Sequence, residues 1–117
     1  MRVETQTTSG VVLYRISGDL TFLNWEEVLV DIKRLYNLGD KQFILNWKGV
    51  GIVDTAGLQT LVSLFKTKRK DPEFNFVLVT DNPNHLKVIK ICGFDKIISI
   101  FPSEEEGLAY YTGVESA

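Results

Sequence analysis

The chain has 117 residues, 44% hydrophobic and 24% charged, which is typical of one globular domain that buries its own core. Its formal net charge of −2 argues against a nucleic acid or an anionic membrane as the main partner. The single cysteine, Cys92, excludes an intramolecular disulfide and fits a reducing cytoplasm.

The chain is expected to open with a β-hairpin. Residues 2–8 are rich in threonine and predict a modest strand, and residues 11–17 predict a stronger one. Ser9-Gly10 supplies the turn between them, and residues 18–21 are expected to end the second strand.

A helix follows the hairpin. Apolar residues recur at helical spacing from Trp25 to Tyr36, and Gly39 is a typical C-terminal stop. Asn24 with Glu27 three residues later fits a capping box, although Thr21 is an alternative start.

The central stretch of the chain, residues 50–58, is expected to be a loop that leads from a buried strand into a second helix. The apolar strand lies around residues 43–45, and the helix runs from about Thr55 to Lys70. Thr55 is an N-cap candidate at a helix start, where unpaired backbone N–H groups and the helix dipole favour anions. A hydroxyl at that position can therefore serve as a helix cap or as a carrier of phosphate.

The second half of the chain predicts two more helices and two more strands. The strands are expected at residues 74–80 and 96–101, and a short helix between them from Asn82-Pro83 to Cys92. Cys92 is expected to be a buried structural thiol. A last helix begins with the capping box at residues 103–106, and the tail at residues 113–117 is expected to fray.

The order of elements therefore predicts an α/β fold in a single domain over residues 1–112. After the opening hairpin, helices and strands alternate, which favours a mixed, largely parallel sheet of four to five strands with about four helices.

The chain shows no residue pattern of a catalytic or metal site. His85 is its only histidine and Cys92 its only thiol, too few for a zinc site or a nucleophile–histidine arrangement, and His85 is expected at or near the surface. Neither of the usual glycine-rich phosphate-binding loops is present. We therefore expect no enzyme activity, no metal and no cofactor. The polar N-terminus and the absence of a long apolar run favour a cytoplasmic protein without membrane contact.

Several segments, taken in order, resemble the STAS domain, and within it the bacterial anti-sigma factor antagonists. Gly18-Asp19-Leu20 is similar to the family's G-[DE]-[LI], and Asp54-Thr55-Ala56-Gly57-Leu58 to its D-[ST]-[ST]-G-L signature. The resemblance continues through Asn82-Pro83 and Cys92-Gly93-Phe94. It covers nearly the whole chain and implies the STAS fold.

The resemblance implies a role in partner switching. An unphosphorylated antagonist binds an anti-sigma factor that is also a serine/threonine kinase, and so frees a sigma factor. The kinase uses ATP to phosphorylate the hydroxyl after the signature aspartate, which here is Thr55, and a phosphatase reverses the modification. The partner surface implied by the same positions consists of Asp19, Thr21, Asp54, Ala56 and Gly57.

The sequence leaves two alternative functions open. STAS domains also occur in transport assemblies, where the domain is a subunit or scaffold that is not phosphorylated. A phosphoaspartate receiver is disfavoured, because the first strand ends in Thr7-Thr8-Ser9 without the acidic pair that receivers need. The edge strand at residues 2–8 can also pair with a second copy, which makes a weak homodimer a further expectation.

Overall fold

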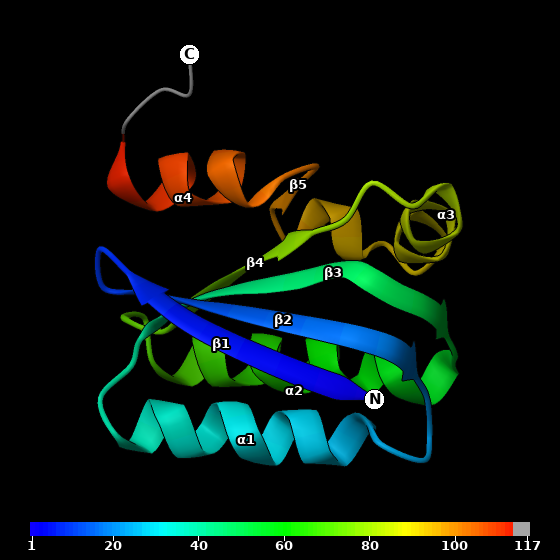
Figure 1. Cartoon of the computed structure of the whole chain (residues 1–117), viewed down its shortest axis with the longest axis horizontal. Coiled ribbons are helices and arrows are strands. Elements are labelled where there is room, and N and C mark those ends of the chain that lie inside the picture. The colour runs from blue at the N-terminus through cyan, green and yellow to red at the C-terminus, as the bar shows by residue number, and fades with distance from the viewer. Residues whose placement is uncertain (114–117) are drawn as a thin grey trace.

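The computed structural model describes residues 1–113 as a five-stranded sheet with helices on both faces (Figure 1). The frayed tail expected at residues 113–117 lies outside the described residues, apart from Gly113, which caps the last helix with a φ of 72°. Ten elements follow one another along the chain: β1 (Arg2–Thr8), β2 (Val11–Leu20), α1 (Trp25–Asn37), β3 (Gln42–Val53), α2 (Thr55–Lys70), β4 (Asn75–Val79), α3 (Pro83–Ile91), the 3-10 helix η1 (Phe94–Lys96), β5 (Ile100–Phe101) and α4 (Glu104–Thr112).

The strands lie in the order β1-β2-β3-β4-β5. β1 and β2 form an antiparallel hairpin, and every other neighbouring pair is parallel. The hairpin turn places Ser9 at a φ of 53° and Gly10 at 76°. Two positive φ angles in succession define a type I′ turn, whose twist matches that of the flanking strands. The predicted α/β fold with a mixed, largely parallel sheet is confirmed.

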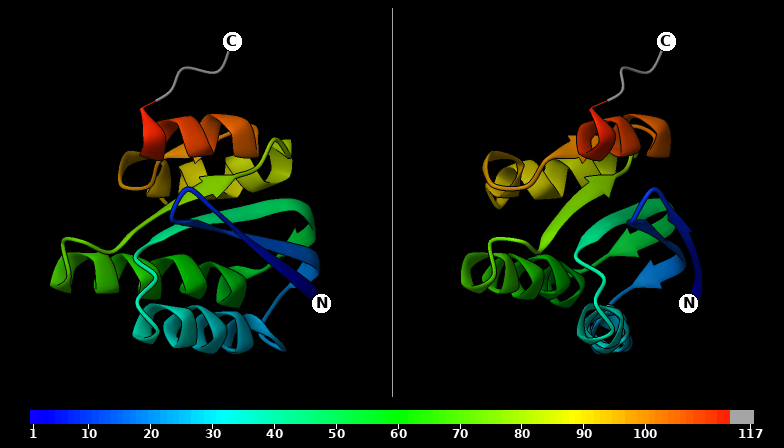
Figure 2. Two further views of the ribbon diagram at one scale, coloured as in Figure 1. Left: turned by 60° about the vertical axis from the view of Figure 1, so that its left-hand side comes forward. Right: turned by 90° about the vertical axis from the view of Figure 1, so that its left-hand side faces the viewer.

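Two hydrophobic cores lie on opposite faces of the sheet. The larger joins the sheet to α1, α2 and α3 through side chains such as Ile32, Leu61 and Ile89. The smaller lies under α4, where Leu108 and Tyr111 pack against buried strand residues. Figure 2 shows α1 and α2 together on one side of the sheet and α4 on the other. Residues 43–45 of β3 and 76–79 of β4 are buried on both faces of the sheet, and both segments are continuous apolar runs.

Two predicted strand ends are wrong because the strands are longer than the sequence suggests. β2 continues through Gly18-Asp19 to Leu20, and β3 continues through residues 50–53, which were expected to form a loop. The two strands stay paired there through register shifts, and Gly18 adopts a φ of 95° that other residues rarely reach. Only Asp54 separates β3 from α2.

Three further local predictions are also corrected. The strand expected at residues 96–101 is reduced to the two residues of β5, because Phe94–Lys96 form a 3-10 helix first. Cys92 is exposed and is the C-cap residue of α3, beyond the last buried residue of that helix, Ile89. His85 is buried, with 3% of its surface accessible. Within residues 1–113 there is no helix with the length and apolar character needed to cross a bilayer.

Candidate functional site

The start of α2 is capped by Asp54, and the prediction that Thr55 is the N-cap is wrong. Asp54 has extended backbone angles, and its Oδ1 accepts a hydrogen bond of 2.8 Å from the N–H of Gly57. Aspartate is a strong N-cap because its carboxylate also faces the positive end of the helix dipole. Thr55 becomes the first helical residue and is exposed, so its hydroxyl is not needed to close the helix.

Gly57 holds the start of α2 close to the end of β2. It is buried, and a Cβ at this position would collide with the backbone carbonyl oxygen of Leu20. The N–H of Asp54 donates to the same carbonyl at 3.2 Å. The sequence expectation placed Gly57 on the partner surface, but its visible role is to allow this close backbone approach.

The second oxygen of the Asp54 carboxylate fixes the loop between β2 and α1. Oδ2 accepts a hydrogen bond of 3.1 Å from the N–H of Phe22. Asn24 stabilises the same loop, since its Oδ1 accepts from the N–H of Thr21 at 3.0 Å and its Nδ2 donates to the Asp19 carbonyl at 2.8 Å. The predicted capping box at Asn24 is therefore wrong, because the side chain that would cap α1 is engaged in the turn before it.

Asp19 joins the ends of β2 and β3. Its Oδ1 accepts a hydrogen bond of 2.9 Å from the N–H of Ile52. Gly51 permits this contact, since a Cβ there would lie 2.8 Å from the same oxygen. The sequence-predicted residues Asp19, Thr21, Asp54 and Ala56 thus lie on three segments that hydrogen bonds connect at one end of the sheet.

Three exposed apolar side chains accompany these polar residues. Phe22, Leu23 and Ile52 expose 70%, 76% and 65% of their surfaces. Phe22 is tied to Asp54 through its amide, and Ile52 to Asp19 in the same way. Sequence reasoning missed them because single apolar residues in a loop or at a strand end follow no periodic pattern. Exposed apolar groups next to polar ones are typical of a protein-binding surface.

His85 of α3 contacts the backbone near the end of β3. Its Nε2 lies 2.8 Å from the carbonyl oxygen of Gly51, and its Nδ1 lies 2.9 Å from Oγ1 of Thr80. Since a carbonyl only accepts, Nε2 carries a proton and donates to it. Beside His85 is a cavity of about 170 Å³ walled mainly by apolar residues, including Trp47, Ile52, Leu58 and Val88. No sequence signal links His85 to Gly51, because 34 positions separate them.

The start of α2 also leaves backbone donors free. The N–H groups of Thr55 and Ala56 make no hydrogen bond with another residue among those described. The helix dipole adds partial positive charge at this point, so an anion on the Thr55 side chain would meet favourable donors. No group of three or more metal-binding side chains occurs within residues 1–113.

The sequence profile of the STAS domain matches residues 2–107. The chain belongs to the STAS domain family. Solved structures agree with the fold of this STAS domain at low sequence identity. An anti-sigma factor antagonist from Mycobacterium paratuberculosis superposes with a TM-score of 0.83 at 17% identity, covering 93% of this chain and 92% of the other.

Two other structures widen the comparison. The Bacillus cell fate determinant SpoIIAA, solved in its phosphorylated form, gives a TM-score of 0.70 at 18% identity, over 94% of this chain and 99% of its own. The murine anion transporter Slc26a9 gives 0.77 at 22% identity, over 93% of this chain but only 19% of the transporter. At these identities the likenesses establish the STAS fold of the chain.

Proposed function

We propose that this STAS domain is an anti-sigma factor antagonist that works by partner switching, with Thr55 as its phosphoacceptor. In its unphosphorylated form it binds an anti-sigma factor that is also a serine/threonine kinase, and a sigma factor is released. The kinase transfers phosphate from ATP to Thr55 and binding is lost, and a phosphatase restores it. The observation that carries the proposal is the exposed Thr55 hydroxyl at the first position of α2, directly after the capping Asp54.

The start of α2 supports a phosphate without a change of fold. Asp54 already closes the helix, so modification of Thr55 removes no internal hydrogen bond that the structure records. A phosphate adds about 1.5 to 2 negative charges at pH 7 and meets the free N–H groups and the dipole of the helix. These favourable terms oppose repulsion from the neighbouring Asp54 carboxylate. The fold is therefore expected to keep its stability within about 1 kcal/mol.

The surface around Thr55 supports protein binding. Hydrogen bonds join the segments of Asp19 and Thr21, and the Asp54 carboxylate ties their loop to the start of α2, which carries Thr55 and Ala56. The exposed side chains of Phe22, Leu23 and Ile52 add apolar area that a partner can cover. A hydrated, doubly charged phosphate in the middle of this surface would prevent that desolvation, which accounts for the loss of binding on phosphorylation.

The decisive experiment is mass spectrometry of the protein after incubation with ATP and the anti-sigma factor kinase of its own cell. Wild type is expected to gain one phosphate that maps to Thr55. Thr55→Ala is expected to gain none, and Thr7→Ala, which removes an exposed hydroxyl at a remote strand, is expected to behave as wild type.

Binding to the same kinase gives an independent measure. Thr55→Glu is expected to weaken the complex while its unfolding free energy stays within about 1 kcal/mol of wild type. Unchanged binding of Thr55→Glu, or phosphate on another residue, would contradict the proposal. If neither phosphorylation nor binding occurs, the domain is better explained as a subunit or scaffold of a transport assembly, such as the one suggested by the likeness to Slc26a9.

A further inference from the structure

The outer edge of β1 is open. β1 is the first strand of the sheet, paired only with β2, and Figure 2 shows no other described segment along its outer side. Its seven residues pair with β2 in unbroken register, without a bulge, and contain neither proline nor lysine. Bulges, prolines and lysines commonly protect an edge strand against pairing with another chain, and β1 has none of them.

The hairpin turn determines which backbone groups of β1 face outward. In a two-residue turn the flanking residues, here Thr8 and Val11, form a hydrogen-bonded pair. Because such pairs alternate along an antiparallel ladder, Gln6 and Glu4 also direct their N–H and C=O groups toward β2. The groups of Val3, Thr5 and Thr7 then point away from the sheet, and none of them has a hydrogen-bond partner among the described residues.

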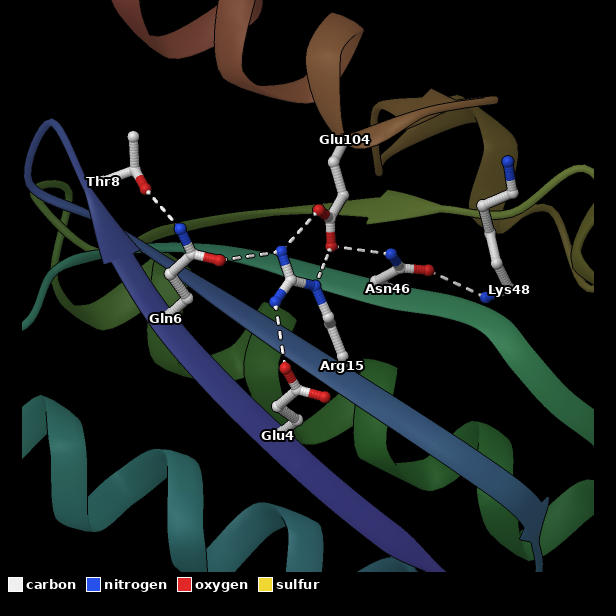
Figure 3. Close-up of polar contacts among 7 residues, drawn as sticks. All are labelled: Glu4, Gln6, Thr8, Arg15, Asn46, Lys48 and Glu104. Carbon is white, nitrogen blue, oxygen red and sulfur yellow. Dashed lines mark hydrogen bonds and ion pairs between the residues drawn. The ribbon is translucent and has the colours of Figure 1, made fainter.

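Two polar side chains of β1, Glu4 and Gln6, contact Arg15 of the neighbouring strand β2. Nη2 of Arg15 donates a hydrogen bond of 3.1 Å to Oε1 of Gln6, and Nη1 forms an ion pair with Glu4 at 3.5 Å. Figure 3 shows both β1 side chains extending toward the guanidinium. Arg15 also forms a two-pronged contact with Glu104 of α4, at 2.7 and 2.8 Å. The side chains of Glu4 and Gln6 therefore lie over β2 and leave the outward backbone groups of β1 uncovered.

We propose that β1 pairs with β1 of a second copy in antiparallel register centred on Thr5, which joins two sheets into one. This register places Thr5 opposite its own copy and Val3 opposite Thr7, so all outward backbone groups are paired. On the other face it places Glu4 opposite Gln6 and Arg2 opposite Thr8, so no like charges stand directly opposite each other. The dimer is independent of the partner-switching role, because the Thr55 surface belongs to other segments of the chain.

The contact is expected to be weak. It joins a polar strand of seven residues and buries far less area than a stable interface. Sedimentation equilibrium of the wild-type chain is therefore expected to show a monomer–dimer equilibrium as concentration rises to about 1 mM. A protein that remains monomeric over this whole range would overturn the proposal.

Two substitutions of Gln6 test the register with opposite signs. Gln6→Glu places two carboxylates opposite each other at both symmetric positions and is expected to weaken the dimer several-fold. Gln6→Lys replaces these with opposite charges and is expected to strengthen it several-fold. Within one protomer the order is the reverse, because Glu at this position would attract Arg15 and Lys would repel it. Equal effects of the two variants on dimerisation would exclude this register.

A proline at the centre tests the backbone pairing. In Thr5→Pro the lost N–H is an outward one, and proline is tolerated in an edge strand at such a position. The variant is expected to keep the wild-type circular dichroism spectrum and to lose dimerisation. A folded Thr5→Pro that dimerises as well as wild type would contradict the proposal.

Cysteine cross-linking locates the two-fold axis without relying on affinity. The exposed Cys92 is first replaced in the variant Cys92→Ser. Thr5→Cys is then expected to form a disulfide-linked dimer on oxidation, since paired Cα atoms about 5.5 Å apart suit a disulfide. Thr7→Cys is the matched control, because the two copies of position 7 would lie four residues apart along the strands, about 14 Å. Equal cross-linking at both positions would overturn the Thr5-centred register.

Discussion

The carboxylate of Asp54 accepts a hydrogen bond of 3.1 Å from the N–H of Phe22, 32 positions earlier in the chain. The same carboxylate caps α2 through Gly57. One side chain therefore both starts the helix that carries Thr55 and fixes the loop that presents Phe22 and Leu23. The shape of the proposed partner surface depends on this double contact.

Substitution of Asp54 separates the two contacts. Asp54→Ala loses both and is expected to lower the unfolding free energy by about 1 to 2 kcal/mol, measured by urea denaturation. Asp54→Asn keeps an oxygen for Gly57 but turns an NH₂ group toward the N–H of Phe22. It is expected to retain most of the stability while the Phe22 amide exchanges faster with solvent in NMR spectra.

A matched control for the cap is available in α4. Ser103 caps that helix, accepting from the N–H of Glu106 at 3.3 Å, and lies outside the Thr55 surface. Ser103→Ala is expected to cost about 1 kcal/mol and to leave Phe22 exchange unchanged. Unaltered protection of Phe22 in Asp54→Asn would show that the loop is held by other contacts.

Gly57→Ala is expected to be strongly destabilising. The added Cβ would collide with the Leu20 carbonyl, a backbone atom that cannot move aside without shifting the start of α2. Overpacking of this kind costs about 1 to 3 kcal/mol, measured as a fall in the urea midpoint. Gly107→Ala is the control, since this buried helical glycine faces the flexible Cδ1 of Ile44 at 3.2 Å and should lose much less. Equal losses in both variants would argue against the backbone contact as the cause.

Glu104 links α4 to the sheet through an ion pair with Arg15 of β2. Arg15 holds its carboxylate at two points, Asn46 Nδ2 donates to Oε2 at 2.7 Å, and hydrogen bonding by Arg15 lowers the pKa of Glu104 (Figure 3). Glu104→Ala is expected to reduce the unfolding free energy by about 1 to 2 kcal/mol. Glu105→Ala removes a neighbouring exposed carboxylate that lies in the same first turn of α4 and has no side-chain partner within residues 1–113. It should change stability by less than about 0.5 kcal/mol, and a loss as large as that of Glu104→Ala would assign the effect to the dipole.

The contacts of Asp71 predict that the unfolding free energy decreases in acid. The Asp71 carboxylate accepts hydrogen bonds from the Tyr36 hydroxyl at 2.6 Å, from Lys41 Nζ at 2.9 Å and from the N–H of Glu73 at 3.0 Å. Together these donors lower the pKa of Asp71 to about 2. Because the folded value lies below the ordinary 3.8, the stabilisation is fully present above pH 3.8 and is lost as pH falls through about 2.

The measurement is the unfolding free energy against pH in wild type and in Asp71→Asn. The variant is expected to be less stable at neutral pH and to lose less stability between pH 3.8 and about 2. Asp95 is an exposed carboxylate without a side-chain partner among the described residues, so Asp95→Asn should follow the wild-type curve. Parallel curves for wild type and Asp71→Asn would contradict the assignment.

The sequence alone determined those features whose causes lie within a few residues. Apolar periodicity is enough to predict that α2 runs from Thr55 to Lys70. Side chains that cap the nearby backbone predict the start of α3 at Asn82-Pro83 and the start of α4 at Ser103. The alternation of strands and helices was enough to predict the α/β sheet. The positions of Asp54 and Thr55 in the signature were likewise visible.

Only the tertiary structure decided features that depend on partners far along the chain. The pairing of β2 with β3 through Leu20 and Val53 turned an expected loop into strand, and it brought Asp19 to the N–H of Ile52. His85 is buried because its ring reaches the Gly51 carbonyl across 34 positions. In these contacts a side chain bonds a backbone group that has no partner nearby in the sequence. Which backbone groups lack such a partner is fixed only when the strands pair, so local sequence patterns do not reveal them.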